Sequence, residues 1–312
     1  MKTQLFIAFA LLLAMPLAAQ QLSFKKETSE GQTHFKYRWL DIKDKKQSLA
    51  FTFENKTMFG RFRNFKGYQP SRVKKTILVA LKKAAAKIDR RKVDISFIER
   101  PSSYSIIVKG KNKDLREKAE KMLLGIRDKA QAKILKKSYY NILTDKFGKT
   151  GVKPDHVRFA MESRKDILPL TQAIVKANPK LRGRQVAEYI LAFIQSIPYS
   201  TLESRRESHG AGFSPPLRLL NNNQGDCDSK VTLMANMLNA MFPRVKVVII
   251  YMPNHALIGV QMTHRKNDKW IRLKDREYIL AEPTGPAMLP FGKIGKQSEF
   301  FVDGLQFTYE IF

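Results

Sequence analysis

The segment GDCDSKVTLMANMLNAM (225–241) contains Cys227, the only cysteine of the chain. Asp226 has a side chain suited to capping a helix start, so Cys227 is expected in the first turn of a helix. Free backbone N–H groups and the helix dipole stabilise a thiolate there, and we expect its pKa to lie well below about 8.5. A lone Cys is either a buried apolar residue or a thiol kept for chemistry, since a disulfide needs two. The apolar residues at helical spacing are Val231, Met234, Leu238 and Met241.

The first residues, MKTQLFIAFALLLAMPLAAQ (1–20), have the layout of a secretory signal peptide. Lys2 precedes an apolar run over 5–19 that ends in small residues, with Ala19 as the last residue of the leader. A membrane anchor is the alternative, but the run is shorter than the roughly 20 apolar residues of a spanning helix. We therefore expect residues 1–19 to be removed and the mature protein to be periplasmic or secreted, with no transmembrane span.

The formal charge of +29 is unevenly distributed along the chain. Residues 21–165 contain 38 Lys and Arg against 15 Asp and Glu, a net charge of +23. Residues 166–312 contain 18 against 13, a net charge of +5. This shift, and the length, predict two domains: a smaller basic α+β domain over 21–150 and a second domain over 165–312. We place the boundary in or just beyond KFGKTGVKPDH (146–156), where Gly, Lys and Pro are typical of an exposed joint.

Local patterns in the basic half predict the order ββα–ββα. HFKYRWLDI (34–42) and SLAFTFEN (48–55) alternate apolar and polar residues, as a hairpin does. An amphipathic helix follows Pro70, and two strands are predicted over 93–99 and 104–110. Asp114 and Glu117 form a capping box for a long second helix.

The basic half has candidate anionic partners. FGRFRNFKGY (59–68) interleaves aromatic and cationic residues, a pattern that also occurs in nucleic-acid binders. For an exported chain, a solvated cationic face or one that binds anionic cell-envelope polymers is the better interpretation, because charge runs are usually only solvated. Nucleic acid is therefore not an expected partner.

The second half predicts helices packed on an antiparallel sheet. RGRQVAEYILAFIQSIPYS (182–200) is an amphipathic helix, and short strands are predicted over 244–252, 255–262, 270–273 and 277–284. His255 opens one strand and Glu282 lies at the end of a later one. In an antiparallel meander these positions share an edge, which brings the imidazole and the carboxylate within hydrogen-bond reach. Together with Cys227 they form a nucleophile, a base and a group that orients the base.

The combination of IPY, PLRLLNNNQGDCDSK, HALIGV and EPT resembles the transglutaminase-like superfamily, most closely its bacterial transglutaminase-like cysteine peptidases. The resemblance covers roughly 165–290 and implies a papain-like core. It also implies a catalytic triad, which falls on Cys227, His255 and Glu282. The chain departs from the family at the third member, where Asp is the more frequent residue.

The resemblance and the residues together predict a cysteine peptidase or amidase that acts on a protein or peptide. Transglutaminase-type cross-linking is one alternative, and a non-catalytic envelope-binding module that uses the basic domain is another. The backbone N–H of Cys227 is a natural oxyanion donor. Gln195 is the first candidate for the second donor, ahead of Tyr199 and Gln224. No cofactor or metal is expected, because the sequence has neither an HExxH motif nor paired cysteines.

Overall fold

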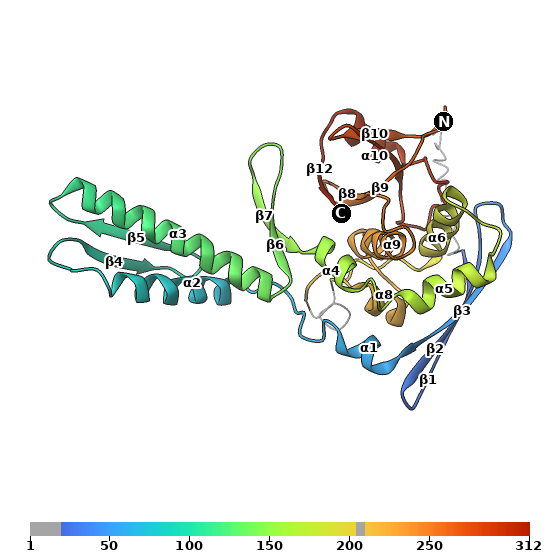
Figure 1. Ribbon diagram of the computed structural model, residues 1–312, viewed down its shortest axis with the longest axis horizontal. Coiled ribbons are helices and arrows are strands. Elements are labelled where there is room, and N and C mark those ends of the chain that lie inside the picture. Colours follow the sequence, from blue (N-terminus) through green and yellow to red (C-terminus); the bar gives the residue numbers. More distant parts are fainter. Residues whose placement is uncertain (1–19, 204–209) are drawn as a thin grey trace, which may run out of the picture.

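The computed structural model describes residues 20–203 and 210–312; the predicted signal peptide over 1–19 lies outside the described residues. The fold is mixed α+β with antiparallel sheets, as expected. Figure 1 shows a rounded body from which a long arm projects to the left. No helix in the described part of the chain combines the length and apolar character needed to cross a membrane.

A five-stranded sheet forms the centre of the body, and each neighbouring pair of strands is antiparallel. Both faces are covered, so β8 and β9 are almost continuously apolar instead of alternating. Helix α9 packs on one face and α10 (Lys296–Asp303) contributes Val302 to the core on the other. In spatial order the strands are β10 (Trp270–Leu273), β11 (Arg276–Ala281), β9 (His255–Gln261), β8 (Val247–Met252) and β12 (Thr308–Ile311).

Helix α9 (Cys227–Met241) is the central helix of the body, as Figure 1 shows. Residues 229–239 are all buried, because α9 is enclosed by the sheet and by other helices. The predicted start, end and Asp226 cap of this helix are confirmed. The helices around it are α4 (His156–Glu162), α5 (Leu168–Ala177), α6 (Arg184–Ser196) and α8 (Pro216–Asn222).

The first sheet lies within the predicted basic domain over 21–150, but its buried face packs on the body. Strand β2 alternates strictly, and its buried face contains Tyr37 and Trp39. Both rings pack against Phe193 of α6, with centroids 5.1 and 5.3 Å away. Alternation shows that one face of a strand is buried, but not which element covers it. The antiparallel strands are β1 (Gln21–Ser29), β2 (Gln32–Leu40) and β3 (Lys46–Glu54).

The separate basic unit is the arm, in which two helices pack on a two-stranded sheet around a core of their own. The predicted helices and strands are found, but Asn112 caps α3 in place of the expected capping box at Asp114. The arm packs on the body where the Phe65 ring meets Phe159 of α4, with ring centroids 4.7 Å apart. After α1 (Asn55–Gly60), the arm comprises α2 (Pro70–Ala85), β4 (Asp94–Glu99), β5 (Tyr104–Lys109) and α3 (Lys113–Lys137), and the hairpin β6 (Tyr140–Thr144) and β7 (Thr150–Pro154) leads back to the body.

Candidate functional site

The start of helix α9 positions Cys227. Asp226 caps the helix by accepting a hydrogen bond from the backbone N–H of Ser229 at 3.0 Å. The Ser229 hydroxyl in turn accepts from the N–H of Ser214 at 2.8 Å, which ties the preceding loop to the same turn. Cys227 is therefore held as the first helical residue, partly exposed, where the sequence places it.

His255 and Glu282 meet at one edge of the central sheet. In the antiparallel pairing of β9 with β11, Ala281 is opposite Ile258, so Glu282 follows directly beside the start of β9. His255 Nε2 lies 2.8 Å from Glu282 Oε1. The predicted hydrogen bond between these two residues is confirmed, and it uses the Nε2 nitrogen, which leaves Nδ1 as the ring nitrogen available for other chemistry.

The Glu282 carboxylate is fixed from its other side by the start of helix α10. Its Oε2 accepts from the N–H of Gly295 at 2.8 Å and from the Ser298 hydroxyl at 3.2 Å. Burial by itself would raise the pKa of Glu282, but the hydrogen bonds from His255, Gly295 and Ser298 outweigh it and hold the pKa below its ordinary value. Glu282 is therefore an ionised acceptor for the imidazole.

The sulfur of Cys227 lies against strand β9. The backbone N–H of Ala256, the residue after His255, lies within hydrogen-bond reach of the sulfur. Nevertheless, burial, together with the charges that Asp228 and Asp226 carry when they are ionised, raises the pKa of Cys227 to about 12, although backbone N–H groups lower it. The expected low pKa is thus wrong for the resting protein, and the thiol is protonated at neutral pH.

Gln195 has a structural use that differs from the predicted oxyanion role. Its side chain is buried, and Nε2 donates to the carbonyl of Glu282 at 2.9 Å and to that of Leu289 at 3.0 Å. An amide nitrogen has two hydrogens, so no donor is left for an oxyanion. Gln195 instead fixes the segment that follows Glu282. Of the other candidates, Tyr199 is 49% exposed near Cys227, and Gln224 is partly buried.

Lys230, three residues after Cys227, is a buried lysine that the sequence patterns do not predict. Lys230 is 0% exposed, and its Nζ donates to the carbonyl of Ile197 at the end of α6. Burial lowers the pKa of Lys230, an effect partly offset by Asp226, whose own pKa is raised by burial. The sequence signal for the proximity of Lys230 to Asp226 is their spacing in GDCDSK, where Lys230 follows Asp226 by one helical turn.

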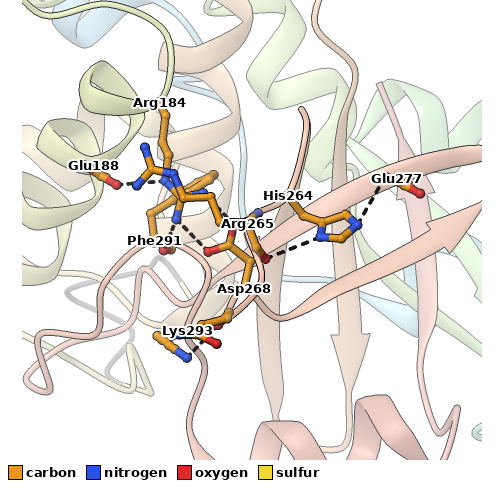
Figure 2. Close-up of polar contacts among 9 residues, drawn as sticks. Arg184, Glu188, His264, Arg265, Asp268, Glu277, Phe291 and Lys293 are labelled. Atoms are coloured by element: carbon orange, nitrogen blue, oxygen red, sulfur yellow. Dashed lines mark hydrogen bonds and ion pairs between the residues drawn. The ribbon is translucent and has the colours of Figure 1, made fainter.

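Arg184 holds the loop between Glu282 and α10, and Figure 2 shows its contacts. Arg184 at the start of α6 forms a two-pronged ion pair with Asp268, at 2.6 and 2.8 Å. The same guanidinium donates to the carbonyl of Phe291 at 2.7 Å and to Glu188 at 2.9 Å. The loop that connects Glu282 to α10 is thereby tied to α6 and to the turn before β10.

A second histidine lies opposite Asp228, the residue after Cys227. His156 of α4 is 0% exposed and its Nδ1 lies 3.0 Å from the Tyr251 hydroxyl. Its Nε2 faces Asp228 Oδ2 at 3.9 Å. No short-range pattern connects these residues, because α4 is short and begins 71 residues before α9.

The described residues contain no group of three or more His, Cys, Asp or Glu side chains placed to hold a metal ion. Comparisons with protein-family models, with curated proteins and with solved structures find no match for this chain.

Proposed function

We propose that the protein is an exported cysteine-dependent acyl-transfer enzyme, most simply a peptidase or amidase with a protein or peptide substrate. Cys227 is the nucleophile, His255 the base and Glu282 the group that orients the base. The observation that carries the proposal is the 2.8 Å contact of His255 Nε2 with an ionised Glu282, next to the strand residue whose N–H reaches the Cys227 sulfur.

The resting thiol makes His255 a general base and not merely one half of a preformed ion pair. As the Cys227 sulfur attacks an amide carbonyl, its proton passes to Nδ1, and Glu282 stabilises the imidazolium. The backbone N–H of Cys227 faces the developing oxyanion. The imidazolium then protonates the leaving amine as the C–N bond breaks. Water, deprotonated by His255, attacks the thioester and releases the acid and the thiol.

Water is the default acceptor for the acyl group, so hydrolysis is favoured over transfer to an amine. A helix that presents Cys227 against an antiparallel sheet bearing His255 supports a papain-like core for the body. The periplasm or the outside of the cell is the proposed location, on the grounds of the sequence over 1–19.

Alkylation of Cys227 by iodoacetamide tests the enzyme proposal without a known substrate. The chain has one cysteine, so incorporated label reports this site alone. We expect labelling of the folded protein, with a rate constant at neutral pH that falls in His255→Ala. The matched control is His264→Ala, because His264 stacks on Trp270 and lacks a role in the proposed site. Labelling only upon unfolding would mean that the site is not assembled, and would favour the binding-module alternative.

Binding of anionic polymers is a second proposed role, favoured by where the charge lies. Residues 70–138 contain 21 Lys and Arg against 7 Asp and Glu, a net charge of +14. Helix α2 has five basic residues and no acidic one. At the root of the arm, a cavity of about 330 Å³ has no acidic residue in its lining, which includes Lys66, Arg72 and Lys137. Such a field attracts polyanions through long-range forces.

Poly-L-glutamate is a suitable probe for this role, with single-stranded oligothymidylate as the nucleic-acid comparison. We expect binding that weakens steeply as salt rises, since screening shortens the reach of exposed charge to about 8 Å at physiological ionic strength. Changing Lys66, Arg72 and Lys137 to Gln should weaken binding more than the same change at Lys118, Lys121 and Lys129, which removes equal charge. Equal losses would exclude a special role for the cavity, and tighter binding of the oligonucleotide would favour nucleic acid.

A further inference from the structure

Hydrogen-bond directions fix the tautomer of His156. Glu310 is ion-paired with Lys153 at 2.6 Å, so it is an acceptor, and the Tyr251 hydroxyl donates its hydrogen to Glu310 at 2.7 Å. A hydroxyl has only one hydrogen, so the Tyr251 oxygen must accept in its 3.0 Å contact with His156 Nδ1. The hydrogen of a neutral His156 ring is therefore on Nδ1.

The other nitrogen of His156 then presents a lone pair to Asp228. Nε2 is buried and has no hydrogen-bond partner among the described residues. It faces Asp228 Oδ2 at 3.9 Å, about 1 Å longer than a hydrogen bond. An ionised carboxylate also presents only lone pairs, so two acceptors would face each other and Nε2 would stay unsatisfied, which is unfavourable for a buried group. A proton on either partner removes this conflict.

We propose that His156 and Asp228 hold one proton between them, and that this shared proton prevents a full negative charge from lying beside the nucleophile. Asp228 Oδ1 is 3.9 Å from the Cys227 sulfur, on the opposite side of the carboxyl group from His156. His156 is thus a positioning residue that acts on Cys227 through Asp228. The effect on catalysis rests on the proposed function, whereas the shared proton itself does not.

The surroundings favour a neutral pair. Burial raises the pKa of Asp228 more than the charges of Lys153 and His255 and the thiol of Cys227 lower it, and burial followed by the charge of Lys153 lowers the pKa of His156. Both shifts favour the neutral forms, with the proton on the carboxyl group. The Asp228 side chain is 34% exposed, which lets it exchange that proton with solvent. Other titratable and charged groups surround the pair on several elements. They are Lys153 on β7, Tyr251 on β8, His255 on β9, Glu310 on β12, Asp155 at the α4 cap, and Asp226 and Cys227 at the start of α9.

The test is the pH dependence of Cys227 alkylation by iodoacetamide in the full chain. In His156→Gln, the amide NH₂ group can donate to the Asp228 oxygen that faced Nε2, and this hydrogen bond favours the ionised, fully charged form of Asp228. A like charge at this distance moves a neighbouring pKa by about one to three pH units, and we expect the rate constant near pH 7 to fall at least about tenfold. In Asp228→Asn, the Nδ2 group donates to His156 and the charge is gone, so the rate constant should equal or exceed that of the wild type.

The double variant separates this mechanism from simple packing. If His156 acts through the charge of Asp228, adding His156→Gln to Asp228→Asn leaves the rate constant unchanged. An equal loss in both backgrounds would show that His156 only packs against its neighbours, and would overturn the proposal. Thermal unfolding of each variant checks that the fold is intact.

Nitrogen NMR of ¹⁵N-histidine-labelled wild type gives a readout that survives if His156→Gln fails to fold. The His156→Asn variant assigns the signal, or Tyr251→Phe does so by shifting it. We expect a hydrogen on Nδ1 and a hydrogen-bonded Nε2 at neutral pH. The opposite tautomer would overturn the shared proton. If instead Cys227 is unreactive in the folded protein, the proposed function fails while the tautomer still decides the status of the pair.

Discussion

The Glu282→Gln substitution should lower both the stability of the fold and the reactivity of Cys227, because the carboxylate accepts hydrogen bonds at both of its oxygens. His255 Nε2 contacts one oxygen at 2.8 Å, while the N–H of Gly295 at 2.8 Å and the Ser298 hydroxyl contact the other. An amide offers one oxygen and one NH₂ group, so it cannot accept on both sides. The Gly295 N–H is fixed in the backbone, and we expect the amide oxygen to face it and the NH₂ group to face His255.

This orientation forces His255 into the other tautomer. Its Nε2 must accept from the amide, which places the ring hydrogen on Nδ1, and Nδ1 can then no longer accept the proton of Cys227. Hydrogen bonds to charged groups contribute about 1.5–3 kcal/mol each, so the loss of one should lower the free energy of unfolding by about 2 kcal/mol at pH 7. The alkylation rate constant of Cys227 near neutral pH should fall by at least about tenfold, since Glu282 no longer supports a base.

The stability effect has a defined pH dependence. The pKa of Glu282 is lowered in the folded protein, so its contribution is present above the ordinary glutamate pKa of about 4.3 and disappears as pH falls through the folded value. Urea unfolding of wild type and variant should therefore differ at pH 7 and converge in acid. The matched control is Glu299→Gln, which makes the same change in the first turn of α10, the helix that Gly295 caps. A Glu282→Gln protein with unchanged stability and unchanged alkylation would refute the assigned geometry.

Three further outcomes are expected. Arg184→Lys loses the two-pronged contact with Asp268 and should lower the free energy of unfolding by about 1.5–3 kcal/mol at pH 7. Because the pKa of Asp268 is lowered chiefly by Arg184, this loss of stability should shrink in acid. A loss that does not depend on pH, measured by urea unfolding, would contradict this. Gln195→Leu should destabilise the fold by about 1–3 kcal/mol, since it leaves two buried carbonyls without donors, and a variant that retains full thermal stability would contradict this structural role. The alkylation rate of wild-type Cys227 should keep rising above pH 8.5, because burial raises the thiol pKa to about 12, and a plateau below that pH would show a preformed thiolate.

Patterns of short range predicted the local elements well. The helix over 227–241 has the predicted bounds, and the strand at 255 begins at the predicted residue, because cap chemistry and apolar spacing act within a few residues. The pairing of His255 with Glu282 was also predictable, since a short antiparallel meander leaves few ways to arrange its edges. These features depend on close neighbours in the chain or on strands joined by short turns.

Features that depend on distant packing were not predictable from the same patterns. The alternation of β2 is the same whether its aromatic face meets the arm or the body, and only the structure shows Phe193 as its partner. Gln195 was assigned as an oxyanion donor from its place near the end of a helix, whereas carbonyls about 90 residues further along use both of its hydrogens. His156 likewise reaches the nucleophile only through the tertiary fold.

The Cys227 pKa shows how such packing changes chemistry. A helix start favours a thiolate, and the helix start is present as predicted, but desolvation of the buried sulfur opposes this local effect. Burial of the sulfur, the largest effect on this pKa, reverses the direction. A thiol that stays protonated until a base removes its proton is less exposed to oxidation than a resting thiolate, because oxidation follows thiolate character. For a lone cysteine in a protein proposed to leave the cytoplasm, a site that ionises the sulfur only when His255 accepts its proton would keep the nucleophile intact between turnovers.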